Sequence, residues 1–242
     1  MKANWKNTAV VIPIFNSEEY LSELFERIFK FFPKEHVFAV NDASMDNSEN
    51  ICHSKLVNLI NIKENTGKGN ALQEGFHAAG KSGFSFAFSI DSDLQHKPED
   101  FAIFLKKQNE EEADLVIGKR DFSRDKMPFP RICSNATTSR IVSIFTQQKI
   151  LDSQSGYRLY SLEAIKDFNF TTKRYQFETE VIIKIAKAGG MIDFVPIDTI
   201  YNGQKSHISH LRDIKNFVNI VLHEAFQDLN KKQDAKPRTE NK

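Results

Sequence analysis

The sequence predicts an α/β fold in which a mainly parallel central sheet is flanked by helices. Short apolar segments alternate with amphipathic segments along the first 120 residues, and this alternation is typical of strands and helices that follow one another around a parallel sheet. The strand segments are apolar at nearly every position, as in strands covered on both faces. Hydrophobic residues make up 40% of the 242 positions and charged residues 27%, so a disordered or collagen-like chain is excluded.

The part of the chain before residue 120 is expected to hold five strands and four helices. The first strand ends at Pro13. The helix after it carries apolar residues at three- and four-residue spacing from Leu21 to Phe32, as on a helix that packs against a sheet. We expect the strands at 8–12, 37–40, 59–62, 84–90 and 114–118, and the helices at 21–32, 46–55, 70–79 and 101–108.

After residue 120 the alternation breaks. Residues 121–130 carry mixed charges and two prolines, so we expect a loop over the functional site. Further helices are expected at 132–145 and 177–188, strands at 156–160 and 192–197, and a last amphipathic helix at 211–229. We therefore divide the chain into a main domain at 1–208, a C-terminal amphipathic helix at 209–230 and a disordered tail at 231–242.

Charge and cysteine content narrow the functional classes. Lys and Arg number 33 and Asp and Glu 32, so the net charge is +1 and nucleic acid is not an expected partner. The longest apolar runs, 9–15 and 84–90, are far shorter than the roughly 20 residues that span a bilayer. Cys52 and Cys133 have no Cys or His at ligand spacing, so we expect reduced core thiols in a cytoplasmic protein.

Two carboxylates and an amide follow the predicted strand at 84–90. Asp91, Asp93 and Gln95 offer the oxygen ligands that hard divalent cations such as Mg²⁺ and Mn²⁺ prefer. Such a cation neutralises charge that develops on a diphosphate leaving group. The alternative is a solvated turn whose Asp caps the next helix. Because parallel sheets bind ligands beyond the carboxyl ends of their strands, this position favours the metal site.

A glycine-rich turn with one lysine leads into the predicted helix at 70–79. Lys68 and the backbone amides of residues 65–70 are suited to a phosphate at a helix start. The spacing is not that of a P-loop. A plain turn before a helix is the alternative.

Charged residues also fall in the loops that should meet this edge of the sheet. Arg120, Arg131 and Arg158 suit bidentate binding of phosphate, although each alone fits a surface ion pair as well. Three of them together favour a local phosphate pocket in an otherwise neutral protein. Glu178 and Glu180, near a helix start, are partners of the helix dipole or candidates for a general base.

Six segments occur in the order seen in family 2 glycosyltransferases, and the chain most resembles the dolichol-phosphate mannose synthase and polyprenyl-phosphate glycosyltransferase branch. The resemblance covers about residues 8–208. The segments are 11–16 (Val-Ile-Pro-Ile-Phe-Asn), 41–44 (Asn-Asp-Ala-Ser), 65–71 (Asn-Thr-Gly-Lys-Gly-Asn-Ala), 91–96 (Asp-Ser-Asp-Leu-Gln-His), 118–120 (Gly-Lys-Arg) and 152–158 (Asp-Ser-Gln-Ser-Gly-Tyr-Arg).

The resemblance implies a GT-A nucleotide-sugar fold in the main domain, a divalent metal, Mg²⁺ or Mn²⁺, and inverting transfer from a nucleotide-diphosphate sugar. By motif position, the donor site would include Pro13, Phe15, Asp42 and Ser92 at the nucleoside, Lys68 nearby, and Asp91, Asp93 and Gln95 at the metal and diphosphate. The acceptor phosphate would meet Arg120 and Arg131, with Ser134 or Asn135. Asp93, Arg120 and Arg131 are then the expected catalytic residues, and Asp152, Arg158, Lys205 and Ser206 the further substrate-binding residues.

The acceptor implied by the resemblance is a polyprenyl phosphate. A sugar hydroxyl needs a base to take its proton, whereas a phosphate is already anionic and needs cationic positioning. The arginines favour the phosphate, and the base candidates Asp152, Glu178 and Glu180 rest on position alone. Two alternatives stay open: transfer to a hydroxyl of a saccharide or lipid-linked glycan, and a nucleotide-sugar-binding subunit without catalysis.

A lipid acceptor also predicts where the protein works. We expect peripheral association with a membrane surface or a membrane-protein partner through the amphipathic stretch 211–229. Packing of that stretch on the main domain is the alternative.

Overall fold

The computed structural model describes residues 1–123 and 129–200, the first three of the second range by their backbone alone. The described elements belong to one compact unit, Met1–Lys205. The predicted helix at 211–229, the predicted tail, Lys205 and Ser206 lie outside the described residues.

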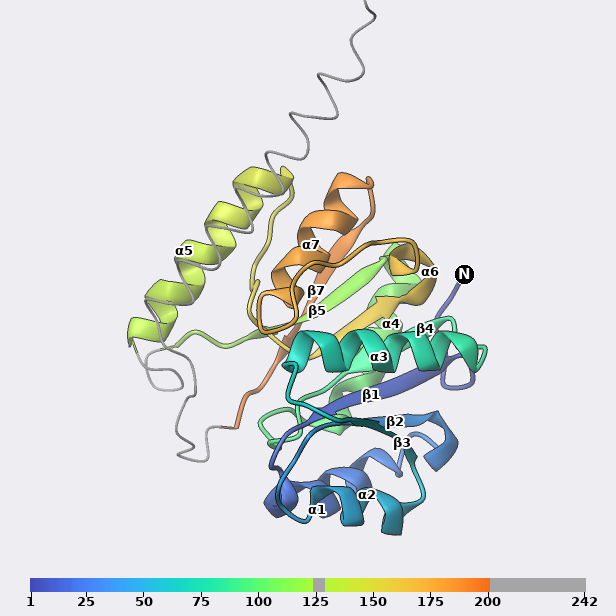
Figure 1. The fold of residues 1–242 in the computed structure, drawn as a ribbon. Coiled ribbons are helices and arrows are strands. Elements are labelled where there is room, and N and C mark those ends of the chain that lie inside the picture. Colours follow the sequence, from blue (N-terminus) through green and yellow to red (C-terminus); the bar gives the residue numbers. More distant parts are fainter. Residues whose placement is uncertain (124–128, 201–242) are drawn as a thin grey trace, which may run out of the picture. The chain divides into compact units, whose positions relative to one another are not determined.

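A seven-stranded mixed sheet forms the centre of this unit, with the strand order β3-β2-β1-β4-β6-β5-β7 (Figure 1). The pairs β1–β2, β1–β4, β2–β3 and β5–β7 are parallel, whereas β6 runs antiparallel to both of its neighbours, β4 and β5. The strands are β1 (Thr8–Ile14), β2 (Val37–Asp42), β3 (Asn58–Ile62), β4 (Phe86–Ser89), β5 (Leu115–Arg120), β6 (Arg158–Ser161) and β7 (Ile192–Ile197).

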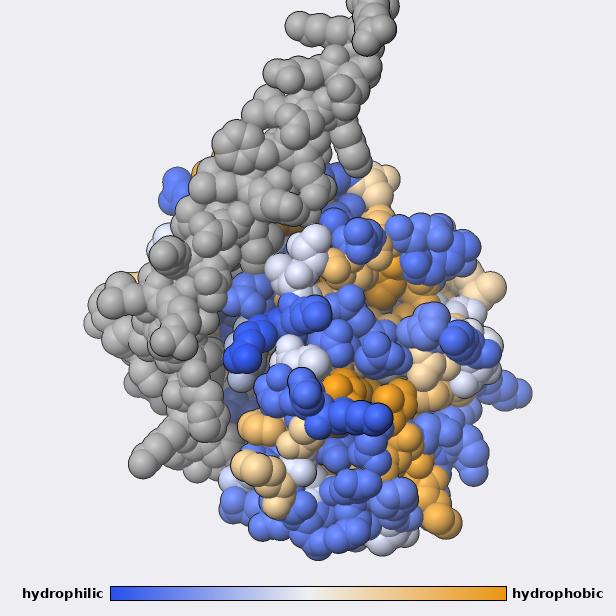
Figure 2. Space-filling model, in the orientation of Figure 1, coloured by the Kyte–Doolittle hydropathy of each residue, from blue (hydrophilic) through white to orange (hydrophobic). Residues whose placement is uncertain are grey.

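Helices cover both faces of the sheet, which confirms the predicted fold class. The helices are α1 (Glu18–Ile28), α2 (Ser48–Lys55), α3 (Lys68–Lys81), α4 (Phe101–Glu111), α5 (Phe129–Thr146), α6 (Leu162–Ile165) and α7 (Phe177–Lys187), with short 3-10 turns at Lys34–His36 and Pro98–Asp100. Helices α1 and α4 pack with Val10, Ile12 and Ile14 of β1 in one hydrophobic core on one face of the sheet. Helix α3 packs against the opposite face, where Gly75 lies against Val11. The outer surface over α1 and α2 is mainly hydrophilic (Figure 2).

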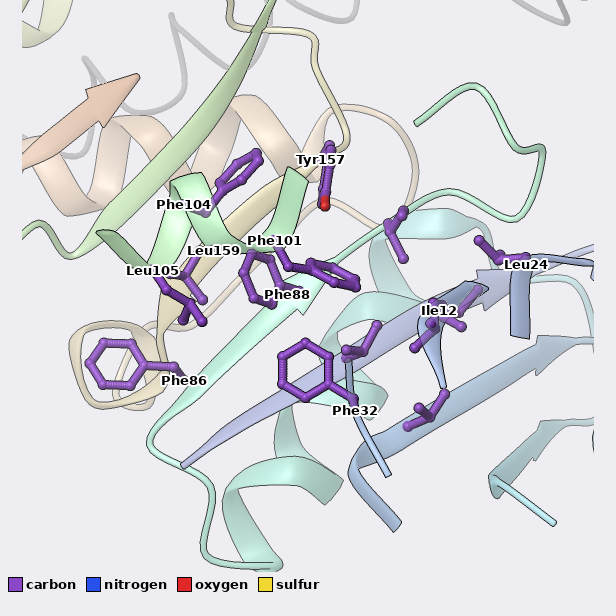
Figure 3. Packing of buried hydrophobic residues seen from close by; sticks show 14 of the residues in the cluster. Ile12, Leu24, Phe32, Phe86, Phe88, Phe101, Phe104, Leu105, Tyr157 and Leu159 are labelled. Carbon is purple, nitrogen blue, oxygen red and sulfur yellow. The ribbon is translucent and has the colours of Figure 1, made fainter. Parts of the chain in front are cut away.

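The core between α1, α4 and the sheet is rich in phenylalanine. Phe32, Phe88, Phe101 and Tyr157 pack toward one another (Figure 3). The ring centroids of Phe88 and Phe101 are 4.5 Å apart, as are those of Phe104 and Tyr157. The Tyr157 hydroxyl donates a hydrogen bond to the Lys97 carbonyl at 3.1 Å. Tyr157 therefore fixes the start of β6 to the core beside α4.

The end of β1 differs from the prediction. The strand does not stop at Pro13 but continues to Ile14. Proline has no backbone N–H and is usually confined to strand edges. β4 pairs with β1 only as far as Val11, opposite Ser89, while β2 pairs with it up to Ile14. At Pro13 the strand therefore has a neighbour on one side only, so the proline is tolerated there.

Two further observations bear on the predictions. Cys52 is buried, but Cys133 is exposed, so only one of the two predicted core thiols lies in the core. None of the helices in the described ranges has the length and apolar character needed to cross a membrane.

Candidate active site

The carboxyl ends of the parallel strands β1, β2, β4 and β5 meet at one edge of the sheet, and most of the predicted site residues gather there. Because β6 is antiparallel to β4 and β5, its first residues lie at this same edge. The segment 152–157, which leads into β6, is therefore brought next to the ends of β4 and β5. Asp152 pairs with Arg120 at the end of β5, and Gly156 lies against Asp91, just beyond β4.

Asp91, Lys68 and Glu178 form a mostly buried chain of charges, which we call the Lys68 cluster. Lys68 Nζ lies 2.6 Å from Asp91 Oδ1 and 2.8 Å from Glu178 Oε1. Burial by itself would lower the pKa of Lys68, but the two carboxylates raise it above its ordinary value. Burial also opposes ionisation of Asp91, yet the Lys68 ammonium holds the pKa of Asp91 below its ordinary value. Lys68 and Asp91 therefore stay charged at neutral pH.

Asp93 lies two residues beyond Asp91, in a turn where its Oδ1 accepts a hydrogen bond from the Gln95 amide at 3.0 Å. Burial, and then the negative charge of Asp91, raise the pKa of Asp93 to about 6. A cation between two such carboxylates offsets the repulsion by which each disfavours the ionisation of the other.

This donor set fits the divalent cation that the resemblance implies. Asp91 Oδ2 has no hydrogen-bond or ion-pair partner among the described residues, since the ion pair of this carboxylate with Lys68 uses Oδ1. Within 1–123 and 129–200 there is no group of three or more His, Cys, Asp or Glu side chains that could hold a metal. A cation held by Asp91 and Asp93 would therefore need other oxygens, such as the Gln95 amide, phosphate and water. Mg²⁺ is commonly bound in this way.

The turn before α3 is held by Asp42 at the end of β2. Asp42 Oδ1 accepts hydrogen bonds from the Thr66 amide at 2.8 Å and the Thr66 hydroxyl at 3.0 Å, and its Oδ2 accepts from the Gly67 amide at 2.7 Å. Gly67 has a φ of +100°, a conformation that favours glycine. Asp42 thus fixes the backbone that carries Lys68, and its contact with a nucleoside stays a prediction.

Phe15 and Ser92, two of the residues predicted to contact the nucleoside, follow the ends of β1 and β4 at this edge. Phe15, directly after β1, is 47% exposed, so its ring is available to a planar ligand. The Ser92 hydroxyl hydrogen-bonds to the Ser17 hydroxyl at 2.7 Å, which ties the end of β4 to the start of α1. Pro13 is buried within β1, one residue before the strand ends.

Arg120 and Asp152 form a second charged pair at the same edge. Arg120 Nε and Nη2 donate to the two Asp152 oxygens at 2.8 and 3.0 Å. Asp152 also accepts from the Arg120, Gln154 and Ser155 amides and from Asn135 Nδ2, so its hydrogen-bond partners among the described residues are all donors. Burial alone would raise the pKa of Asp152, but Arg120 lowers it. Asp152 therefore orients Arg120 and is a poor candidate for a base.

The predicted acceptor residues on α5 are only partly described. Asn135 is buried and contacts Asp152 rather than facing solvent. Ser134 is half-buried, and its carbonyl accepts a hydrogen bond from the Thr138 hydroxyl at 3.1 Å. The side chain of Arg131 is not among the described parts, so its role stays a prediction.

Arg158 differs from the prediction that it contacts a substrate phosphate. Its side chain is fully buried, and its guanidinium donates to the Ser155, Glu178 and Ser153 carbonyls at 2.6, 2.7 and 2.9 Å. Because β6 is antiparallel to β4, its first residue, Arg158, lies at this edge of the sheet. Arg158 therefore has a structural role in this arrangement.

Two of the charged helix residues also have internal partners. Glu180 is buried and accepts four hydrogen bonds from the amides and hydroxyls of Thr171 and Thr172. Glu178 accepts from Lys68. Neither carboxylate is therefore positioned as an unpartnered base.

His96 and Gly156 are site residues to which the sequence analysis assigned no role. His96 is buried, its Nδ1 has no hydrogen-bond partner among the described residues, and burial lowers its pKa to about 4. A Cβ on Gly156 would lie 2.5 Å from Lys68 Nζ and 2.6 Å from Asp91 Oδ2. A glycine next to a predicted strand is the sequence signal for such a close approach.

An α/β sheet with two carboxylates, a lysine and an arginine at its carboxyl edge belongs to the class of α/β proteins in which ligands bind at this edge. The sequence profile described as glycosyl transferase family 2 matches residues 9–168, and the chain belongs to this family. The protein is thus a family 2 glycosyltransferase, and its fold is the GT-A fold predicted from the motifs.

Individual relatives agree with this assignment. An uncharacterized protein of Methanocaldococcus jannaschii is 32% identical over 197 residues, which cover 79% of this chain and 81% of that protein. The UDP-N-acetylglucosamine–dolichyl-phosphate N-acetylglucosaminyltransferase of Methanococcus voltae is 27% identical over 216 residues, covering 79% of this chain and 85% of that enzyme.

Among solved structures, glucosyl-3-phosphoglycerate synthase from Mycobacterium tuberculosis has the same fold. In its complex with Mn²⁺, UDP-glucose and phosphoglyceric acid it superposes with a TM-score of 0.70 at 18% identity. The match covers 90% of this chain and 79% of that chain.

Proposed function

We propose that the protein is an inverting glycosyltransferase that moves a sugar from a nucleotide-diphosphate sugar to a polyprenyl phosphate, assisted by Mg²⁺ or Mn²⁺. The observation that carries the choice of acceptor is the state of the three carboxylates considered as bases. Asp152, Glu178 and Glu180 are all engaged by internal donors. An acceptor hydroxyl would need a base, whereas a phosphate is already ionised at neutral pH.

The donor half of the site is supported by the chemistry of its side chains. Asp91, Asp93 and Gln95 would hold a divalent cation, which neutralises charge on the departing nucleotide diphosphate when it is bound. Lys68, at the start of α3, adds a cationic group beside this position. Phe15 offers an exposed ring for the base of the nucleotide. The similarity in fold to a synthase solved with Mn²⁺ and UDP-glucose supports the same class of donor.

The acceptor half is supported by Arg120. Asp152 fixes the Arg120 guanidinium through two hydrogen bonds. The side chain therefore loses little conformational entropy when it binds an anion. A fixed cation of this kind orients a phosphate for attack on the sugar from the side opposite the leaving group. The relative from Methanococcus voltae is named for transfer to dolichyl phosphate, which supports a lipid phosphate as the acceptor class.

Substitution of Arg131 tests the acceptor. The purified protein is assayed with Mn²⁺, a panel of UDP- and GDP-sugars, and either undecaprenyl phosphate or free oligosaccharides. Arg131→Ala should lower transfer to the lipid phosphate by at least 100-fold, since it removes a charged contact to the acceptor. Donor binding, measured by calorimetry with Mn²⁺, should stay near that of the wild type.

Arg140→Ala is the matched control, because Arg140 is an exposed arginine of the same helix, α5. It should leave transfer within a factor of two. Transfer to free oligosaccharides but not to undecaprenyl phosphate would establish the hydroxyl alternative. Donor binding without transfer to either acceptor would establish a binding subunit.

A further inference from the structure

Glu178 is a buried carboxylate to which the proposed transfer gives no role. Its side chain is 6% exposed, and its Oε1 lies 2.8 Å from Lys68 Nζ. The two residues are 110 positions apart in the sequence, and α7 brings Glu178 to the start of α3. A carboxylate is rarely buried to this degree without a paired charge. Here the paired charge is the same ammonium that holds Asp91.

We propose that Glu178 is a positioning residue for the metal site, because it shares the Lys68 ammonium with Asp91 and so keeps Asp91 available to a divalent cation. The inference rests on the proposed donor site and deepens it. It assigns to Lys68 the second role of a counter-charge that holds Asp91 Oδ1 and competes electrostatically with a cation on the same carboxylate.

The geometry of the shared ammonium gives the physical reason. Lys68 Nζ lies nearly equally far from Asp91 Oδ1 and Glu178 Oε1, at 2.6 and 2.8 Å. With Glu178 neutral, Asp91 would be the remaining full negative charge in contact with Lys68. The attraction between them would then be undivided, in surroundings where charge pairs interact more strongly than in water. A cation would have to compete with a tighter Asp91–Lys68 pair.

The charge of the site also matches a divalent ion only when Glu178 is ionised. Asp91, Asp93, Glu178 and Lys68 together carry a charge of −2 when all four are ionised. Neutralising Glu178 leaves −1. The natural residues therefore neutralise the two positive charges of a divalent cation. Without the Glu178 charge, one positive charge is left over.

Gly156 provides a second observation that the cluster is closely built. A Cβ at this position would lie 2.5 Å from Lys68 Nζ and 2.6 Å from Asp91 Oδ2, the oxygen that Lys68 does not hold. Only a residue without a side chain lets the segment 152–157 approach the cluster so closely. The backbone of this segment therefore limits where the Asp91 carboxylate and the Lys68 ammonium can move.

The test measures binding of Mn²⁺ alone, by electron paramagnetic resonance of the free ion, to the full-length protein without donor or acceptor. Glu178→Gln keeps the shape and a hydrogen-bond acceptor for Lys68 but removes the charge. It should weaken Mn²⁺ binding about tenfold, a coupling within the range of interacting charged neighbours. In a Lys68→Met background, the same change at Glu178 should cost about threefold or less, because the competing ammonium is gone.

Glu180→Gln is the matched control. Glu180 is a buried carboxylate of the same helix, but its hydrogen bonds go to Thr171 and Thr172. This variant should keep the Mn²⁺ affinity even if its melting temperature falls. Gly156→Ala should weaken Mn²⁺ binding, because its Cβ would displace Lys68 or Asp91, whereas Gly80→Ala, where a Cβ meets no atom within 4 Å, should not affect binding.

The outcomes separate this inference from the proposed function. Wild-type affinity in Glu178→Gln, or an equal cost in the Lys68→Met background, overturns the role of Glu178 and leaves the proposed metal site intact. An equal loss in Glu180→Gln also overturns it, since the effect would then come from α7 as a whole. Failure of the wild type to bind Mn²⁺ overturns the proposed metal site together with the inference.

Discussion

The Arg120–Asp152 pair allows a quantitative prediction, because the hydrogen bonds of the Asp152 carboxylate with the described residues can be counted. Six donors in the described ranges reach its two oxygens. Asp152→Asn must place an amide NH₂ group against some of these donors. If the amide oxygen takes the place of Oδ1, the Arg120 amide and Arg120 Nε lose their acceptor.

The expected loss of stability follows from this count. Leaving a buried donor without an acceptor costs about 1–3 kcal/mol each, so two donors cost roughly 3 kcal/mol. Breaking a buried ion pair by removing one partner costs about 3–5 kcal/mol, and the lower end applies because the Arg120 side chain is 19% exposed. Both routes give about 3 kcal/mol. For a unit of this size, that lowers the melting temperature by roughly 6–12 °C.

The measurement is thermal unfolding by circular dichroism from pH 3 to pH 7. The folded-state pKa of Asp152 is lowered, so its stabilising contribution is present above the unfolded pKa near 4 and is lost as pH falls through the folded pKa. The difference between wild type and Asp152→Asn should therefore be constant from pH 7 to pH 5 and shrink below about pH 4.

A matched control is available for this prediction. Asp167 is exposed, and Asp167→Asn should change stability by no more than about 0.5 kcal/mol. A melting temperature of Asp152→Asn within about 1 °C of the wild type at pH 7 would refute the reasoning. It would mean that the carboxylate charge does not stabilise this edge of the sheet.

Two further predictions concern the metal and the membrane. Asp93→Asn should abolish Mn²⁺-dependent transfer while leaving the circular dichroism spectrum unchanged, because it removes the charge of a proposed metal ligand. Full activity of this variant, or of the wild type in EDTA, would contradict a metal-assisted mechanism. If the amphipathic stretch meets lipid, deletion of 209–242 should release the protein from vesicles that contain undecaprenyl phosphate. In a flotation assay, the shortened protein should then stay in the bottom fraction instead of rising with the vesicles. An unchanged distribution, or unfolding of the shortened chain, would instead support packing of the stretch on the main domain.

The fold, and the edge of the sheet at which polar residues gather, were largely predictable from the sequence. Near-continuous apolar segments such as Ala9–Ile12 are typical of strands covered on both faces, and β1 is buried at all seven positions. In a parallel sheet such strands all end at one edge. Polar residues at these ends, such as Asp42 and Asp91, are therefore expected at the same edge whatever their distance in the sequence.

The direction of β6 could not be predicted, and the roles of several residues depend on it. The apolar pattern around Leu159 and Tyr160 indicates a strand but is the same for either direction. Because the strand is antiparallel, its first residue, Arg158, lies at the site edge of the sheet. There its side chain is buried and donates to backbone carbonyls. In the sequence it is an arginine at a polar loop, as Arg120 is.

The contact of Glu178 with Lys68 could not be predicted from the sequence for a similar reason. An acidic residue near a helix start is usually explained by the helix dipole, and nothing local indicates a lysine 110 residues away. Only the packing of α7 against α3 brings the two together. Contacts between helices that lie far apart in the sequence depend on side-chain packing that periodicity does not encode.

The proposed transfer also gives a role to the segment that leads into the antiparallel strand β6. Within this short segment, Asp152 holds Arg120, which is proposed to meet the acceptor, and Gly156 lies against Asp91, which is proposed to hold the metal of the donor. Arg158 holds the same segment through the Ser153 and Ser155 carbonyls. An inverting transfer would need the attacking and departing phosphates held in line on opposite sides of one sugar. A single segment that contacts residues of both proposed halves, and that is bound by a buried guanidinium, would meet that need.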